Sequence, residues 1–142
     1  MIKGLGHTAI RTSDLEKSVQ FYTETLGLKE AFRLNDADGK PFIVYIYVGP
    51  RQFIELFPNG TKEAQYTKEQ IGLVHICLEV DDVEAAYKEL QRKQVPFDTG
   101  IVDGKAKCRQ FWIHDPDGTP IELMELPPAS LQAQAIARME EV

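Results

Sequence analysis

The sequence has few cysteines, no excess of basic charge and no long apolar run. Cys77 and Cys108, its two cysteines, lack the spacing of a metal site or a disulfide framework, so we expect reduced thiols. Lys and Arg number 16 against 22 Asp and Glu, with no basic stripe, which argues against binding to nucleic acid. No apolar run approaches the roughly 20 residues of a membrane span, and the N-terminal segment lacks the pattern of a secretory signal. These absences predict a soluble cytoplasmic protein.

The chain contains two segments with the same order of features, residues 2–57 and 71–126. Each begins with a strand-like run, continues with a capped amphipathic helix, and ends with three more strand-like runs. The polar stretch 58–70 between them is typical of a linker. The length of 142 residues suits one domain. We therefore predict an α+β fold in which two βαβββ modules make up a single domain over residues 1–126.

The boundaries of these elements follow from caps, turns and periodicity. Thr12-Ser13-Asp14 is a candidate helix cap in the first module, with Gly27 as its C-cap, and Asp81-Asp82 is the cap in the second. After the modules, residues 127–142 are predicted to hold an amphipathic helix at Ser130–Glu141. The expected strands are 6–10, 28–34, 41–48 and 52–57 in the first module, and 73–80, 95–101, 106–113 and 119–126 in the second.

Histidine and glutamate occupy matching places in the two modules. His7 lies in the first strand of module one and His75 in the first strand of module two, while Glu55 and Glu122 lie in the last strands. Glu55 follows His7 by 48 residues and Glu122 follows His75 by 47, counted along the chain. The chain has only three histidines, and two of them occupy equivalent positions in the two modules, which indicates a shared function.

Strand alternation places each glutamate on a face that it shares with large apolar groups. Phe53 and Phe57 flank Glu55, and Met124 follows Glu122, on the same face of their strands. A carboxylate among apolar neighbours loses several kcal/mol of solvation unless a positive group compensates. Two imidazoles and two carboxylates therefore predict one divalent metal ion, and this mixed donor set is compatible with Zn, Ni, Co, Fe or Mn.

The runs GHTAIRTSDLEKSVQFYTETLGL, QFIEL, LVHICLEVDDVEAAYKEL and DPDGTPIEL together resemble the vicinal oxygen chelate superfamily, over about residues 2–126. Glyoxalase I, methylmalonyl-CoA epimerase, extradiol dioxygenases and bleomycin-resistance proteins are members. The resemblance implies two βαβββ modules that form a cupped mixed sheet around a metal held by His7, Glu55, His75 and Glu122. It also implies a homodimer.

Within this superfamily, the glutamate at position 55 indicates which member the chain resembles most. Extradiol dioxygenases use two His and one Glu, and the epimerase commonly has Gln at the position that matches Glu55, so the present set looks like glyoxalase I. Arg11 and Asn59 match residues that hold glutathione there, and Arg11 suits a peptide carboxylate. An arginine that some glyoxalases place before the second metal histidine is missing from 70–74, and Lys105 or Lys107 is a candidate substitute.

The resemblance thus implies a lyase that isomerises the hemithioacetal of glutathione and a 2-oxoaldehyde through an enediolate. Glutathione would be the co-substrate, and Ni, Co or Zn the metal. Glu122 is expected to move the proton between adjacent carbons, with Glu55 as its counterpart. Two alternatives stay open: another metalloenzyme of the superfamily, such as an epimerase or an Fe(II) dioxygenase, and a metal-free protein that sequesters a small ligand. Tyr45, Phe53, Phe57 and Trp112 would line the cup of such a protein.

Overall fold

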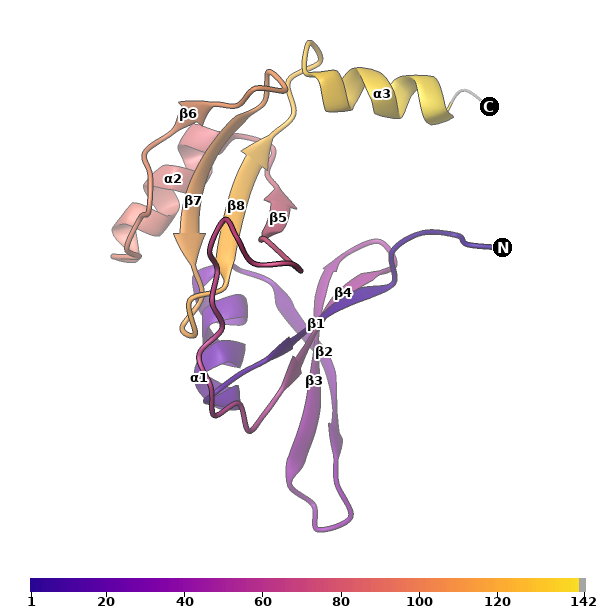
Figure 1. Ribbon diagram of the computed structural model, residues 1–142, viewed down its shortest axis with the longest axis vertical. Helices are drawn as coiled ribbons and strands as arrows, with labels where there is room; N and C mark the ends of the chain where they lie inside the picture. Colours follow the sequence, from indigo (N-terminus) through magenta and orange to yellow (C-terminus); the bar gives the residue numbers. More distant parts are fainter. Residues whose placement is uncertain (141–142) are drawn as a thin grey trace. The chain divides into compact units, whose positions relative to one another are not determined.

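The computed structural model describes residues 1–140, which form two compact units (Figure 1). The first unit ends at Ala64 and the second begins at Gln65. The first contains β1 (His7–Arg11), α1 (Leu15–Gln20), the π-helical turn η1 (Phe21–Thr25), β2 (Lys29–Asn35), β3 (Pro41–Gly49) and β4 (Gln52–Phe57). The second contains β5 (Ile76–Glu79), α2 (Val83–Arg92), β6 (Val102–Asp103), β7 (Arg109–His114), β8 (Pro120–Glu125) and α3 (Leu131–Glu140).

Each unit is built on a four-stranded mixed sheet, and the two sheets have equivalent topologies. The strand orders are β1-β4-β3-β2 and β5-β8-β7-β6. In both, the first strand of the module runs parallel to the last, and the remaining neighbours are antiparallel. A parallel pair needs a crossover connection, which the helix of each module supplies. The predicted α+β fold of two βαβββ modules is confirmed.

In the first unit, α1 and η1 cover one face of the sheet. Asp14 caps α1 by accepting a hydrogen bond from the backbone N–H of Lys17, as predicted. After Gln20 the helix widens into η1, where the N–H of Leu26 donates to the carbonyl of Phe21. Gly27 then ends the helix with a positive φ of 74°. The core under this helix contains Leu15, Val19, Tyr22, Val44, Ile46, Ile54 and Leu56.

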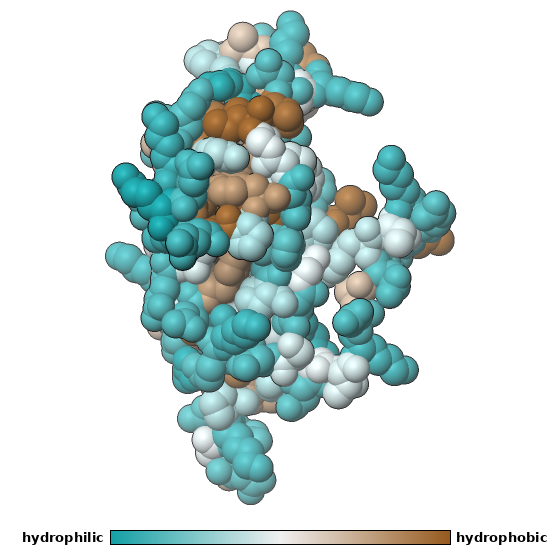
Figure 2. Space-filling model, turned by 90° about the vertical axis from the view of Figure 1, so that its left-hand side faces the viewer, coloured by the Kyte–Doolittle hydropathy of each residue, from teal (hydrophilic) through white to brown (hydrophobic). Residues whose placement is uncertain are grey.

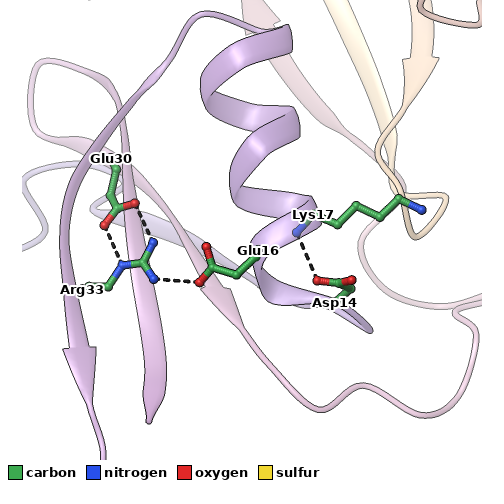
Figure 3. A network of polar contacts seen from close by, with 5 residues as sticks. All are labelled: Asp14, Glu16, Lys17, Glu30 and Arg33. Atoms are coloured by element: carbon green, nitrogen blue, oxygen red, sulfur yellow. Dashed lines mark hydrogen bonds and ion pairs between the residues drawn. The ribbon is translucent and has the colours of Figure 1, made fainter. Parts of the chain in front are cut away.

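An ion-pair network joins α1 to the β2 strand (Figure 3). The guanidinium of Arg33 donates two hydrogen bonds to Glu30, at 2.7 and 2.8 Å, and one to Glu16 at 2.7 Å. These contacts lower the pKa of Glu30 and raise that of Arg33. The bidentate contact with Glu30 fixes the direction of the Arg33 guanidinium, so the network connects the start of α1 to the β2–β3 hairpin.

In the second unit, α2 packs against β7 and β8. Asp82 caps this helix by accepting from the backbone N–H of Ala85 at 2.8 Å. Val83 and Leu90 are buried at the interface with the sheet, and Tyr87 stacks on Phe97. Figure 2 shows this side of the molecule, where hydrophilic residues predominate and a hydrophobic patch lies among them in the upper half.

The predicted strand at 95–101 is wrong, since the strand that follows α2 is the short β6 at Val102–Asp103. Pro96 lies inside the predicted run and has no backbone N–H to donate to a sheet. The N–H groups of Asp98 and Thr99 both donate to one carbonyl, that of Trp112, which is irregular pairing. The segment therefore lies along β7 without forming a ladder.

The C-terminal helix is present and begins one residue later than predicted. Ser130 caps it by accepting from the N–H of Ala133, and the N–H of Leu131 donates to the carbonyl of Ala106. No described residue of α3 is buried. The predicted end of the helix at Glu141 lies outside the described residues. Among residues 1–140, no helix has the length and apolar character needed to cross a membrane.

Candidate metal centre

His7 and Glu55 form a contact pair in the first unit. The β1 and β4 strands are parallel and in register, with Ala9 opposite Glu55, so His7 and Glu55 lie diagonally on one face of the sheet. The Nε2 atom of His7 lies 3.1 Å from a carboxylate oxygen of Glu55. Glu55 is buried, with 6% of its surface exposed, while about half of the His7 side chain is open to solvent.

His75 and Glu122 form the same contact in the second unit. The Nε2 atom of His75 lies 3.0 Å from a carboxylate oxygen of Glu122, which is 7% exposed. The prediction that His75 lies within the first strand of module two is wrong by one residue, because β5 begins at Ile76 and His75 directly precedes it. Cys77, within that strand, lies opposite Glu122 in register. Each unit therefore presents one imidazole nitrogen beside one buried carboxylate.

Aromatic and sulfur side chains make the surroundings of the two carboxylates different. Tyr45 lies directly across from Glu55 on β3, and a hydrogen bond to that carboxylate is the main cause of a raised pKa of the Tyr45 hydroxyl. Trp112 occupies the equivalent place opposite Glu122, and its ring meets the His75 ring edge-on at 4.7 Å. The pKa of the Cys77 thiol is raised to about 12, first by desolvation and then by the Glu122 charge.

The chemistry of these pairs fits a divalent ion. Two ligand atoms that each lie about 2.1 Å from an ion, at a right angle, are about 3 Å apart, which is close to the Nε2-to-oxygen distance in each pair. A buried carboxylate beside an imidazole nitrogen is also a donor pair for Zn, Ni or Co. His7 with Glu55, and His75 with Glu122, are thus the two pairs whose donor atoms could bind a metal.

One feature of His75 departs from the usual pattern of metal-binding histidines. Such residues commonly donate their second ring N–H to an acceptor that fixes the tautomer. Within residues 1–140, the Nδ1 atom of His75 is buried and has no hydrogen-bond partner. The imidazole is instead held by the contact of its Nε2 atom with Glu122 and by packing against the Trp112 ring.

The two residues predicted to hold glutathione lie next to each other at the end of β1 and β4. Arg11 shares the sheet face of His7, and its guanidinium donates to the carbonyl of Pro58 at 2.9 Å and lies 5.5 Å from the centre of the Phe57 ring. Asn59 follows in a left-handed conformation with a φ of 69°. Its neighbour Gly60 packs so closely on Thr12 that an added Cβ would lie 3.1 Å from the Thr12 carbonyl oxygen.

The third histidine and the candidate lysines lie elsewhere in the second unit. His114 contacts Asp98 through its Nδ1 atom at 2.9 Å, outside the repeat of His and Glu, as expected. Lys107 has a φ of 60° in the turn between β6 and β7, where its N–H donates to the carbonyl of Gly104, and Lys105 lies in the same turn.

A separate acidic cluster is formed by Asp82, Glu84 and Glu125, whose carboxylates approach within 4.8 Å of one another. Each already has a structural partner. Asp82 caps α2, Glu125 accepts from the N–H of Val83 at 2.9 Å, and Glu84 pairs with Arg109. These contacts account for the cluster without an ion.

Sequence reasoning identified Tyr45 only as a candidate lining residue and missed its contact with Glu55. The side-chain alternation of PFIVYIYVG already places Tyr45 on one face with Tyr47. What decides the contact is the β3–β4 register, which sets Tyr45 across from Glu55. That register depends on the Gly49–Gln52 connection, where the pairing is irregular.

Comparison with known proteins identifies the family. Residues 4–123 match the profile of the Glyoxalase/Bleomycin resistance protein/Dioxygenase superfamily. The chain is 30% identical to a lactoylglutathione lyase of Pseudomonas putida, over 86% of this chain and 84% of that one. It is 32% identical to the uncharacterized protein YwbC of Bacillus subtilis, over 88% and 99%.

A solved structure extends the similarity to almost the whole chain. The trypanothione-dependent glyoxalase I of Leishmania major is 29% identical, has a TM-score of 0.70, and matches 99% of this chain and 97% of its own. The predicted resemblance to the vicinal oxygen chelate proteins is confirmed. With its two βαβββ modules and matching profile, the chain belongs to the glyoxalase/bleomycin resistance/dioxygenase superfamily.

Proposed function

We propose that this protein is a metal-dependent lyase of the glyoxalase I type, which isomerises the hemithioacetal formed by glutathione and a 2-oxoaldehyde. The observation that carries the proposal is the repeated pair, His7 with Glu55 and His75 with Glu122, at nearly equal distances. Relatives named lactoylglutathione lyase at about 30% identity support it. In the proposal, the two pairs together bind one divalent ion, for which Ni, Co and Zn are the candidates.

The reaction needs a base that moves one proton between two adjacent carbons. When bound, the ion supplies stabilisation of the negative charge that develops on the substrate oxygens. Glu122 takes the proton from the first carbon and returns it to the second, and Glu55 is its counterpart on the other side of the repeat. Both carboxylates are buried, which keeps bulk water away from the group that would carry the proton.

Glutathione would be held at the outer end of the first sheet. Arg11 carries a permanent charge suited to a peptide carboxylate, and Asn59 beside it can offer an amide. The Arg11 guanidinium is already oriented by the Pro58 carbonyl and the Phe57 ring. The remaining N–H groups of the fork are then free to bind the peptide without a large loss of side-chain entropy.

The proposal includes a homodimer. Large apolar side chains are exposed in the segments that precede the edge strands β1 and β5: Ile2, Leu5, Ile71, Leu73 and Val74. Exposed apolar residues next to unpaired strand edges are typical of protein interfaces. Light scattering should give the mass of two chains, and a monomer at micromolar concentration would contradict this part of the proposal.

The test of the reaction is the hemithioacetal assay after reconstitution with Ni, Co or Zn. General-base catalysis contributes about 10²–10⁴-fold, so Glu122→Gln should lower turnover by at least about 100-fold. Glu79→Gln is the matched control, because Glu79 lies on the same face of the sheet but has no place in the repeat. Full activity in Glu122→Gln would reject the base, and an inactive wild type that has bound metal would reject the lyase.

A second function is favoured by one specific observation, an aromatic row beside Glu55. The Phe32 and Tyr45 rings stack at 4.2 Å, and Phe53 meets Tyr45 edge-on at 6.0 Å. Such a surface suits a small aromatic ligand, as in a sequestering protein that needs no metal. A purified wild type that takes up none of the three metals in a titration would favour this function over the lyase.

A further inference from the structure

We propose that Tyr45 is a positioning residue for Glu55. Its hydroxyl would orient the Glu55 carboxylate so that one carboxylate oxygen faces the His7 imidazole. This inference rests on the proposed metal-binding role of Glu55. Tyr45 lies outside the four proposed ligands and acts through one of them.

The position of Tyr45 is fixed by the sheet and by its aromatic neighbours. It lies directly across from Glu55 in the antiparallel pairing of β3 and β4, on the face that carries His7. Its ring stacks on Phe32 at 4.2 Å and meets Phe53 edge-on at 6.0 Å. A third contact, edge-on at 6.2 Å, is with the His7 ring itself. Three ring contacts leave the hydroxyl little freedom to turn away from the carboxylate.

A donor at this place meets a need of Glu55. A carboxylate that is only 6% exposed has lost most of its water, so each of its oxygens needs a donor from the protein. One oxygen lies against the Nε2 atom of His7 at 3.1 Å. The Tyr45 side chain, directly across on β3, brings a phenolic O–H that can donate to this carboxylate. Hydrogen bonds of this kind fix the orientation of a metal-ligating carboxylate.

The equivalent carboxylate in the second unit has a different neighbour. Trp112 stands opposite Glu122, and its ring packs edge-on against His75. The side chain next to Glu122 on β5 is Cys77, whose thiol is a weaker donor than a phenol. Of the two carboxylates, Glu55 therefore has the stronger donor across from it.

Tyr45→Phe tests this role, because it removes the hydroxyl and keeps the ring that stacks on Phe32. Tyr47→Phe is the matched control, since Tyr47 lies on the same strand and face but opposite Phe53. Metal affinity is measured by titrating the metal-free protein with Ni, Co and Zn, without substrate. Second partners of metal ligands are worth about 10–100-fold in affinity. Tyr45→Phe should therefore bind at least about 10-fold more weakly, and Tyr47→Phe within about twofold of the wild type.

A double-mutant cycle with Glu55→Gln separates positioning from a general loss of structure. If Tyr45 acts through the Glu55 carboxylate, Tyr45→Phe should cause no further loss of affinity in the Glu55→Gln background. Affinity of Tyr45→Phe equal to that of the wild type, or losses that add in the double variant, would overturn the proposal. Failure of the lyase assignment looks different, because it would leave these affinities unchanged and show only as metal-loaded protein without turnover.

Discussion

A bound divalent ion should stabilise the fold, and loss of either histidine of the repeat should remove most of that stabilisation. An ion present at about 100 times its dissociation constant stabilises the folded state by about 2.7 kcal/mol. In a chain of 142 residues, 1 kcal/mol corresponds to about 2–4 °C in Tm. The wild type should therefore melt roughly 5–11 °C higher with the ion than without it.

The size of the loss in the variants follows from the way in which the donors are divided. His7→Ala and His75→Ala each leave three of the four donors. Loss of a residue that hydrogen-bonds to a metal ligand weakens metal affinity by about 10–100-fold, and we use the upper value, about 100-fold, for loss of a ligand itself. The same ion concentration then only equals the dissociation constant, where stabilisation is about 0.4 kcal/mol. The rise in Tm should fall to roughly 1–2 °C, and to the same extent in both variants, because each unit contributes an equivalent pair.

Scanning calorimetry of the metal-free protein, with and without added Ni, Co or Zn, measures this effect. His114→Ala is the control, because His114 contacts Asp98 and lies outside the repeat. It should keep the full rise in Tm. If His7→Ala or His75→Ala also keeps the full rise, the ion does not need both units, and the reasoning that joins the two pairs in one site is refuted.

Three further predictions concern the scaffold. Leu56→Ala should lower the free energy of unfolding in urea by about 2–5 kcal/mol, because Leu56 is fully buried, and a loss under about 1 kcal/mol would contradict its place in the core. Asp82→Ala should cost about 1 kcal/mol in the same assay, since it removes the cap bonded to Ala85, and no loss would show the cap to be dispensable. Glu84→Gln should lower Tm at neutral pH, because it removes the ion pair with Arg109. Arg109 lowers the pKa of Glu84, so the pair stabilises the fold at pH values above the ordinary pKa of glutamate. This stabilisation is lost as the pH falls through the lowered pKa. The Tm of this variant should therefore meet that of the wild type in acid, and a difference that persists there would contradict the pairing.

Much of the candidate site could be predicted from local patterns. The caps Asp14 and Asp82 and the alternation of the strands are short-range signals, and they place Glu55 and Glu122 on the face away from the helices. Comparison of the modules then links each glutamate to the histidine that the structure brings to about 3 Å. The pairing was predictable because a histidine and a glutamate occupy matching places in both modules, whereas a single such pair in one module would carry little weight.

What could not be predicted depends on contacts between distant residues. The segment 95–101 has the composition of a strand apart from Pro96, which is a local signal against one, and the distant carbonyl of Trp112 decides how its N–H groups pair. The contact of Tyr45 with Glu55 depends on the β3–β4 register, which alternation alone does not set. The widening of the first helix into η1 also has no counterpart in the apolar spacing of the sequence.

The central claim is that the two pairs hold one ion that makes the protein a lyase. It is tested most directly by measuring hemithioacetal turnover while a divalent metal is added in known amounts to the metal-free protein. We predict that turnover rises in proportion to added metal, stops rising at one ion per chain, and disappears again with a chelator. Turnover that is absent at every metal ratio, or that is the same with and without the chelator, would contradict the account.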